Sequence, residues 1–174
     1  MSSGPRILLF TGPGKGKTTA ALGLVLRAAG HGLWTGFIQF IKSAPTGELQ
    51  SLTLLKNVEI IQTGLGFLPA PGSPAFARHK AAAEQGLERA GAIIVSGNFD
   101  VVVLDEICLA VHRGLLEEKC VIEIVHQAQA GMVIVLTGRE ASENLMGLAD
   151  TVTEMRCVKH GLHSGHPAQK GVEL

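Results

Sequence analysis

Short, continuous apolar runs alternate along the chain with longer segments in which apolar residues recur every three or four positions. The runs predict buried β-strands, and the longer segments predict amphipathic helices. The expected strands are residues 6–10, 34–40, 58–62, 101–104, 132–136 and 151–159. The expected helices are residues 18–29, 48–56, 75–96, 115–129 and 142–148, the last with Ser142 as its N-cap. Helices between fully apolar strands indicate an α/β fold, in which a mostly parallel sheet is covered by helices on both faces.

Length and composition narrow the class of protein. The chain has 174 residues, which predicts a single domain over residues 1–174. A hydrophobic fraction of 46% with only 17% charged residues indicates a core-rich globular protein. The net charge of +0 argues against nucleic acid and anionic membranes as partners. No apolar run is long enough for a membrane span or a signal peptide, and three scattered cysteines favour a reducing, cytoplasmic compartment.

A glycine-rich turn joins the first expected strand to the first expected helix. Glycines let backbone N–H groups converge on an anion, and the helix directs the positive end of its dipole to the same point. The turn predicts a P-loop, in which Lys17 reaches phosphate oxygens and the Thr18 hydroxyl ligates Mg²⁺. The loop is one residue shorter than the usual pattern or begins with threonine, and the alternative is an ordinary strand–helix turn. The candidate phosphate-binding residues are Thr11, Gly12, Pro13, Gly14, Lys15, Gly16, Lys17, Thr18 and Thr19.

The P-loop makes the expected fold a three-layer, P-loop NTPase-like (RecA-like) architecture. Two acids, Asp105 and Glu106, end the apolar strand at 101–104. Acids at this place beside a P-loop can hold Mg²⁺ directly or through water, so Thr18, Glu106 and Asp105 are the candidate metal ligands. We expect Glu106 to share the ion with Thr18, and Asp105 is the second choice. The alternative is a strand that reaches solvent at acidic residues.

Further candidates follow other strands, because ligands of parallel sheets bind beyond the carboxyl ends of the strands. Arg139 could neutralise a polyphosphate through bidentate contacts, and a surface arginine after a turn glycine is an equally good interpretation. The remaining candidates at this edge are Gln39, Lys42, Lys159 and His160.

Motifs that cover nearly the whole chain in order carry a family resemblance. They are residues 10–21, 27–32, 39–42, 47–48, 64–67, 102–106, 136–139, 149–155, 159–160 and 165–173. Together they resemble the ATP:corrinoid adenosyltransferases of cobalamin synthesis and salvage. The run at 149–155, with Lys159 and His160, discriminates this family better than the P-loop does.

The resemblance implies an enzyme that transfers the 5′-deoxyadenosyl group of ATP to a reduced Co(I) corrinoid and releases triphosphate. It also implies a homodimer, Mg²⁺ or Mn²⁺ as cofactor, a flavoprotein reductant, and a nucleotide reversed relative to ordinary P-loop enzymes. Because Co(I) is the nucleophile, the protein must align cobalt with C5′ and neutralise the leaving group. Two other functions stay open: a P-loop ATPase that releases ADP, and a corrinoid- or nucleotide-binding module without turnover.

The loop at residues 64–74 is the predicted corrinoid site, with Phe67, Leu68 and Pro69 as its contacts. It follows an expected strand, so it should lie on the P-loop edge, and its apolar surface is costly to expose without a partner. The alternative is a mobile surface loop. Members of the family carry tryptophan at the position of Pro69, so we expect weaker handling of corrinoids with a bulky lower ligand. Members also carry an N-terminal arm over the active site, and we expect that cover to be absent or supplied differently here.

Overall fold

One parallel sheet forms the centre of the computed structural model, which describes residues 4–172. Its strands lie in the order β3-β2-β4-β5-β1-β6, and every neighbouring pair is parallel. The strands are β1 (Arg6–Thr11), β2 (Thr35–Gln39), β3 (Val58–Gln62), β4 (Val101–Asp105), β5 (Val133–Thr137) and β6 (Thr151–Glu154). The register places the last residues of β3, β2 and β4 side by side, because Gln39 pairs with both Gln62 and Asp105. The expected parallel sheet is confirmed.

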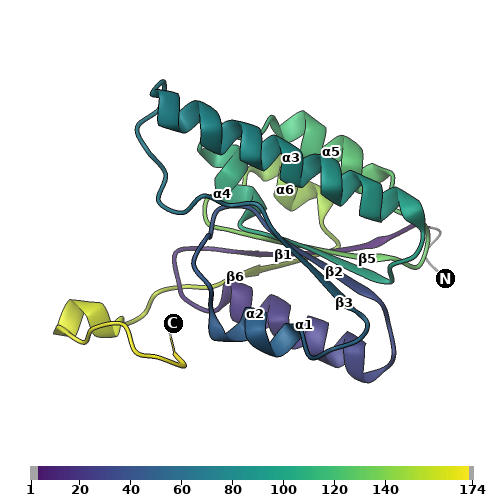
Figure 1. The fold of residues 1–174 in the computed structure, drawn as a ribbon, viewed down its shortest axis with the longest axis horizontal. Helices are drawn as coiled ribbons and strands as arrows, with labels where there is room; N and C mark the ends of the chain where they lie inside the picture. Colours follow the sequence, from purple (N-terminus) through teal and green to yellow (C-terminus); the bar gives the residue numbers. More distant parts are fainter. Residues whose placement is uncertain (1–3, 173–174) are drawn as a thin grey trace.

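Helices cover both faces of the sheet (Figure 1). On one face lie α1 (Lys17–Gly30) and α2 (Gly47–Leu52). On the other lie α3 (Pro74–Ser96), α4 (Ile107–His112), α5 (Glu118–His126) and α6 (Glu143–Leu148). Alternate strand residues enter two separate cores: Leu104 packs beneath the larger helix layer, and Val103 packs against α1. This three-layer arrangement is the predicted one.

Caps fix the ends of the helices that follow loops. The Ser142 hydroxyl accepts a hydrogen bond from the N–H of Leu145 at 3.1 Å, which confirms the predicted cap of α6. Ser73 caps α3 in the same way through the N–H of Phe76, and Pro74 occupies the first turn, where its missing N–H costs nothing. No helix within residues 4–172 combines the length and the apolar character that a membrane crossing requires.

Three of the expected elements differ from the predictions made from the sequence. The expected helix at 115–129 is the shorter α5, Glu118–His126. A further helix that was not predicted, α4, begins directly after Glu106 and ends before Gly114, whose φ of 71° reverses the chain. The expected strand at 151–159 ends at Glu154, because the Met155 carbonyl accepts a hydrogen bond from the N–H of Gly14 instead of continuing the sheet. The expected helix at 48–56 is also shorter and ends at Leu52.

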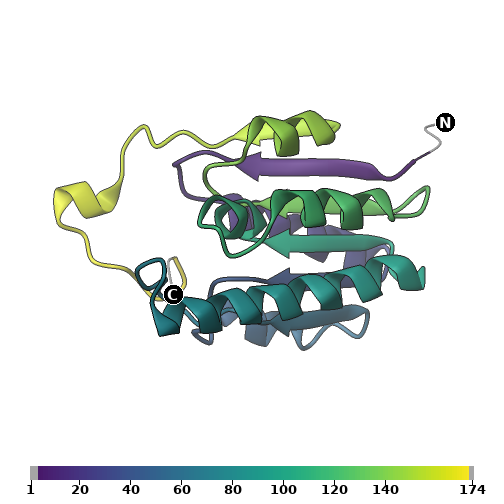
Figure 2. The ribbon, with the colours of Figure 1, turned by 90° about the horizontal axis from the view of Figure 1, so that it is seen from above.

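The early end of β6 changes the position of the C-terminal segment. Residues 155–172 leave the sheet and run past the carboxyl ends of the strands, with a short 3₁₀ turn at Gly161–Ser164 (Figure 2). Lys159 and His160 therefore do not follow a strand directly, which corrects their predicted placement.

Candidate active site

The P-loop is shaped by contact with the chain that follows β6. Gly12 and Gly16 have φ values of 95° and 115°, which only glycine adopts without strain. Gly14 donates its N–H to the Met155 carbonyl at 2.6 Å. A Cβ at Gly12 or Gly14 would stand 2.6 Å from the same carbonyl oxygen. The glycines therefore make a close backbone approach possible as well as a turn.

Lys17 begins α1 and is directed into the P-loop. Its side chain is 6% exposed, and its ammonium donates to the carbonyls of Gly12 and Gly14, both at 2.7 Å. Burial lowers the pKa of Lys17, and the nearby positive charge of Arg139 lowers it further. An anion in the loop would stabilise this ammonium, so the geometry suits the binding of phosphate.

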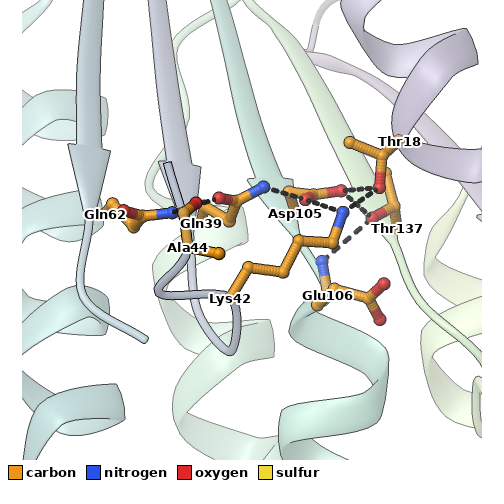
Figure 3. Close-up of polar contacts among 8 residues, drawn as sticks. All are labelled: Thr18, Gln39, Lys42, Ala44, Gln62, Asp105, Glu106 and Thr137. Atoms are coloured by element: carbon orange, nitrogen blue, oxygen red, sulfur yellow. Dashed lines mark hydrogen bonds and ion pairs between the residues drawn. The ribbon is translucent and has the colours of Figure 1, made fainter. Parts of the chain in front are cut away.

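Asp105 is the centre of a buried hydrogen-bond network at the carboxyl end of β4 (Figure 3). Its Oδ1 accepts from the hydroxyls of Thr18 at 2.9 Å and Thr137 at 2.7 Å. Its Oδ2 accepts from the amide of Gln39 at 2.9 Å, and the Gln39 carbonyl oxygen accepts from the amide of Gln62 at 2.7 Å. This network fixes the Asp105 carboxylate from several sides, and the fixed carboxylate in turn orients the Thr18 hydroxyl.

Glu106 stands beside this network in a strained backbone conformation, with φ of 65° at the start of α4. Its N–H donates to the Thr137 hydroxyl at 2.9 Å. Its Oε2 is buried and has no hydrogen-bond partner among the described residues. Burial raises the pKa of Glu106, and the neighbouring charge of Asp105 raises it further. An unpaired carboxylate oxygen of this kind is suited to a cationic ligand.

The oxygen atoms near the P-loop fit Mg²⁺. Thr18 and Glu106 both line one cavity, and hydroxyl and carboxylate oxygens are ligands that Mg²⁺ prefers together with phosphate oxygens and water. Within the described chain no group of three or more His, Cys, Asp or Glu side chains is placed to hold a metal ion. A metal at this site would therefore need most of its ligands from a nucleotide and from water.

These residues surround a polar cavity of about 570 Å³. The P-loop and the start of α1 form one wall, and Glu106 and Arg139 come from the ends of β4 and β5. The C-terminal segment closes another side, where the Lys15 ammonium donates to the Val172 carbonyl. The cavity is lined by Gly14, Lys15, Gly16, Lys17, Thr18, Thr19, Leu22, Lys42, Gly47, Glu48, Ser51, Glu106, Arg139, His160, Gly171 and Val172.

The structure brings together most of the candidates for phosphate binding. Thr11, Gly12 and Pro13 support the loop but do not line the cavity, and Gln39 and Asp105 lie buried behind it. Lys159 is not among the lining residues, whereas His160 is. Sequence reasoning missed Gln62, Glu48, Ser51 and the C-terminal wall at 171–172. The one signal in the sequence for Gln62 is that a polar residue ends an expected strand at the same edge as the P-loop.

A second cavity, of about 580 Å³, lies beside the loop at residues 64–74. The loop is held against the chain after β2, because Gly66 donates its N–H to the Ile41 carbonyl at 2.9 Å and a Cβ at Gly64 would collide with that carbonyl. Phe67 is completely exposed on this loop. The second cavity is mainly apolar and is lined by Ile41, Lys42, Ser43, Ala44, Thr46, Gly66, Phe67, Leu68, Pro69, Pro71, Phe76, Leu109 and Arg113.

Known proteins match both the sequence and the fold. A family model described as ATP:corrinoid adenosyltransferase BtuR/CobO/CobP matches residues 4–174. A corrinoid adenosyltransferase of Pseudomonas aeruginosa is 38% identical over 170 residues, which are 97% of this chain and 83% of that protein. A corrinoid adenosyltransferase of Escherichia coli K12 is 35% identical over 168 residues, which are 96% of this chain and 84% of that protein.

A solved structure supports the fold alone. The flagellar accessory protein FlaH of Methanocaldococcus jannaschii aligns with a TM-score of 0.59 at 13% sequence identity. The alignment covers 88% of this chain and 72% of that one.

Proposed function

Because the chain belongs to the ATP:corrinoid adenosyltransferase family, it is an enzyme that transfers an adenosyl group from ATP to a corrinoid, and we propose how its two cavities share that reaction. The polar cavity binds ATP through its triphosphate, and the apolar cavity binds the corrin ring. The observation that carries this assignment is that the two cavities adjoin at one residue, Lys42. Two sites for such different substrates must meet where a group passes from one to the other.

In the polar cavity the P-loop holds the triphosphate. Lys17 supplies a buried positive charge, and Lys15 and Arg139 supply charge around it. The backbone N–H groups at the start of α1 add the positive end of the helix dipole. These groups bind a leaving group of high negative charge, so we propose that triphosphate is the second product.

Mg²⁺, or Mn²⁺ in its place, is the proposed cofactor. Thr18 and Glu106 would hold it, with Asp105 fixing the Thr18 hydroxyl from behind. When bound, the ion supplies positive charge to the phosphate oxygens. The unpartnered Oε2 of Glu106 is the feature that supports a cation here.

In the apolar cavity Phe67, Leu68 and Pro69 form the proposed contact surface for the corrin. The full exposure of Phe67 supports this, since a large aromatic side chain on the surface gains most from being covered. A ring pressed against this surface would also keep water away from the cobalt.

The chemistry needs no acid or base from the protein. The electron pair of Co(I) attacks C5′ of the 5′-deoxyadenosyl group, a cobalt–carbon bond forms, and the C5′–O bond to the triphosphate breaks. The enzyme aligns the two reactants and neutralises the charge that remains on oxygen.

We also propose that residues 1–174 act as one domain, that the enzyme is a cytoplasmic homodimer, and that a flavoprotein supplies the electrons that generate Co(I). These proposals rest on the family resemblance. The free cysteines Cys108, Cys120 and Cys157 support a reducing compartment.

A product assay tests the function. The protein is incubated with ATP, Mg²⁺ and chemically reduced cobalamin, and the nucleotide and phosphate products are separated. We expect triphosphate in equal amount to adenosylated corrinoid, and none when the corrinoid is omitted. Release of ADP without corrinoid would indicate an ATPase instead, and tight binding of both substrates without product would indicate a binding module.

A further inference from the structure

Lys42 is the one residue of the described chain that lines both cavities. It lies in the connection between β2 and α2. We propose that Lys42 is a catalytic residue, whose ammonium stabilises the negative charge that develops on the oxygen leaving C5′. The inference rests on the proposed assignment of ATP and corrinoid to the two cavities.

The backbone immediately before Lys42 is fixed. Phe40 donates its N–H to the Asp105 carbonyl at 3.1 Å, and the Ile41 carbonyl accepts from Gly66 at 2.9 Å. The first contact anchors Lys42 to the acidic strand β4, and the second anchors it to the corrinoid loop. A lysine held this way keeps its position relative to both cavities.

The ammonium of Lys42 is directed toward the P-loop side of this junction (Figure 3). It donates to the Thr18 hydroxyl at 2.9 Å and lies 3.5 Å from Oδ2 of Asp105. Its side chain is still 36% exposed, so the ammonium can turn toward a substrate without leaving a buried position. Thr18 and Asp105 thus hold the Lys42 ammonium next to the proposed metal position and leave it partly exposed.

The other cations of the polar cavity are placed elsewhere. Lys17 is directed into the P-loop, Lys15 contacts the Val172 carbonyl, and none of Lys15, Lys17 and Arg139 lines the apolar cavity. The bond that breaks must lie between the triphosphate and the cobalt, at the junction. Of the described cationic side chains, Lys42 alone lines that junction from both sides.

The step conserves atoms and electrons without a proton transfer. Co(I) gives two electrons to the new bond with C5′ and becomes Co(III). The electron pair of the C5′–O bond stays on the oxygen, so negative charge grows there as the bond lengthens. A fixed ammonium beside that oxygen binds the transition state more tightly than ATP, which lowers the barrier.

The test compares Lys42→Met, Lys42→Gln and Lys42→Arg with Lys80→Met, a control on an exposed position of α3. We expect Lys42→Met and Lys42→Gln to lower kcat by ~10²–10³-fold, the usual effect of removing one charge-stabilising donor. The dissociation constant of ATP and the Mg²⁺ concentration for half-maximal rate should change by less than about threefold, because the contact strengthens only in the transition state. Lys42→Arg should restore part of kcat, and Lys80→Met should match the wild type.

Three results would overturn the inference. One is an unchanged kcat in Lys42→Met and Lys42→Gln. Another is a loss that excess Mg²⁺ restores, which would mean that Lys42 only positions Thr18. The third is a loss of kcat in proportion to a loss of folded protein in both variants, measured by thermal unfolding. A wild-type enzyme that makes no adenosylcorrinoid would instead refute the proposed function.

Discussion

The polar and the apolar cavity have nearly the same volume, about 570 and 580 Å³, but they are built in opposite ways. Behind the polar cavity, buried side chains are fixed by hydrogen bonds before any substrate arrives, as Asp105 is by Thr18, Gln39 and Thr137. Beside the apolar cavity, Phe67 is fully exposed, and the loop is attached by the backbone hydrogen bond of Gly66 and by Leu68, which packs against the core. One site has its charges arranged in advance, and the other offers apolar surface that a ligand must cover.

The difference suits the substrates that we propose for the two cavities. A triphosphate carries dense negative charge, which water solvates well. Only donors that are already in place can substitute for this water, because donors that must first reorient cost free energy. A corrin ring is broad and largely apolar, so its binding depends on area rather than on exact geometry. Mutations in the polar cavity should therefore have large and specific effects, and mutations in the apolar cavity should have smaller and graded ones.

Lys17→Ala gives the sharpest test of the polar cavity. We expect ATP affinity to fall by ~10²–10³-fold or more, because a buried charge-assisted contact with phosphate is lost. Titration calorimetry with ATP and Mg²⁺ measures the effect, and corrinoid binding should not change. Unchanged ATP affinity and turnover in this variant would contradict the assignment of the P-loop.

Glu106→Gln tests the metal position. We expect the Mg²⁺ concentration for half-maximal rate to rise by about tenfold or more, since an amide oxygen is a weaker ligand than a carboxylate. Glu84→Gln, at an exposed position of α3, is the control. If the Mg²⁺ dependence does not move, Glu106 is not a ligand and Asp105 becomes the better candidate.

Phe67→Ala tests the apolar cavity by removing the largest exposed side chain of the loop. We expect cobalamin affinity to fall by about ten- to hundredfold, in line with the loss of ~1.5–3 kcal/mol of apolar burial. ATP affinity should stay at the wild-type value. Leu65→Ala is a matched control, because Leu65 is exposed on the same loop and does not line the cavity. Wild-type affinity and turnover in Phe67→Ala would exclude this loop as the corrinoid site.

Pro69→Trp tests whether the same surface handles the lower ligand of the corrinoid. An added aromatic ring offers more contact area against the ring face, so we expect activity on complete cobalamin to rise by about threefold. Activity on a truncated corrinoid without the lower ligand should rise less. Equal changes in activity on the two corrinoids would mean that the residue at position 69 does not act on the lower ligand.

The smallest expected effect concerns the stability of the free protein. Because its pKa is raised, Glu106 binds its proton more tightly in the folded than in the unfolded state. That contribution to folding is complete below the unfolded pKa and is lost as pH rises through the folded pKa. At neutral pH the buried carboxylate is charged at a cost in stability, and the neutral amide of Glu106→Gln removes that cost. This variant should therefore raise the free energy of unfolding at neutral pH by about 1 kcal/mol. The gain should shrink as the pH falls toward the ordinary pKa of glutamate, about 4.3, and urea unfolding at several pH values measures it.

Much of the fold follows from local pattern. Strands such as Val101–Asp105 are buried along their whole length by the sheet and its helices, so their apolar runs identify them directly. The P-loop and the acids after β4 are equally local, because the chemistry of each lies in adjacent residues. The sequence therefore predicts the sheet, the carboxyl-end edge and most residues of the polar cavity.

The predictions from the sequence fail where contacts between distant parts of the chain determine the structure. The carboxyl end of β6 is set by the contact of Met155 with Gly14, which no pattern near residue 155 reveals. The short α4 is too brief to show a helical period, and its start depends on the left-handed conformation of Glu106. Gln62 reaches Asp105 only through Gln39 on a neighbouring strand, so its place in the network depends on strand order.

The contact between Gly14 and Met155 also sets an order of assembly during synthesis. The P-loop is among the first parts of the chain to leave the ribosome, but β1 lies between β5 and β6, which are made last. A nascent chain that has emerged only as far as β4 has no neighbours for β1 and no wall for its P-loop. Nucleotide binding should therefore begin only after about residue 155 has emerged, so arrested ribosomal complexes of increasing length should acquire ATP binding in one late step.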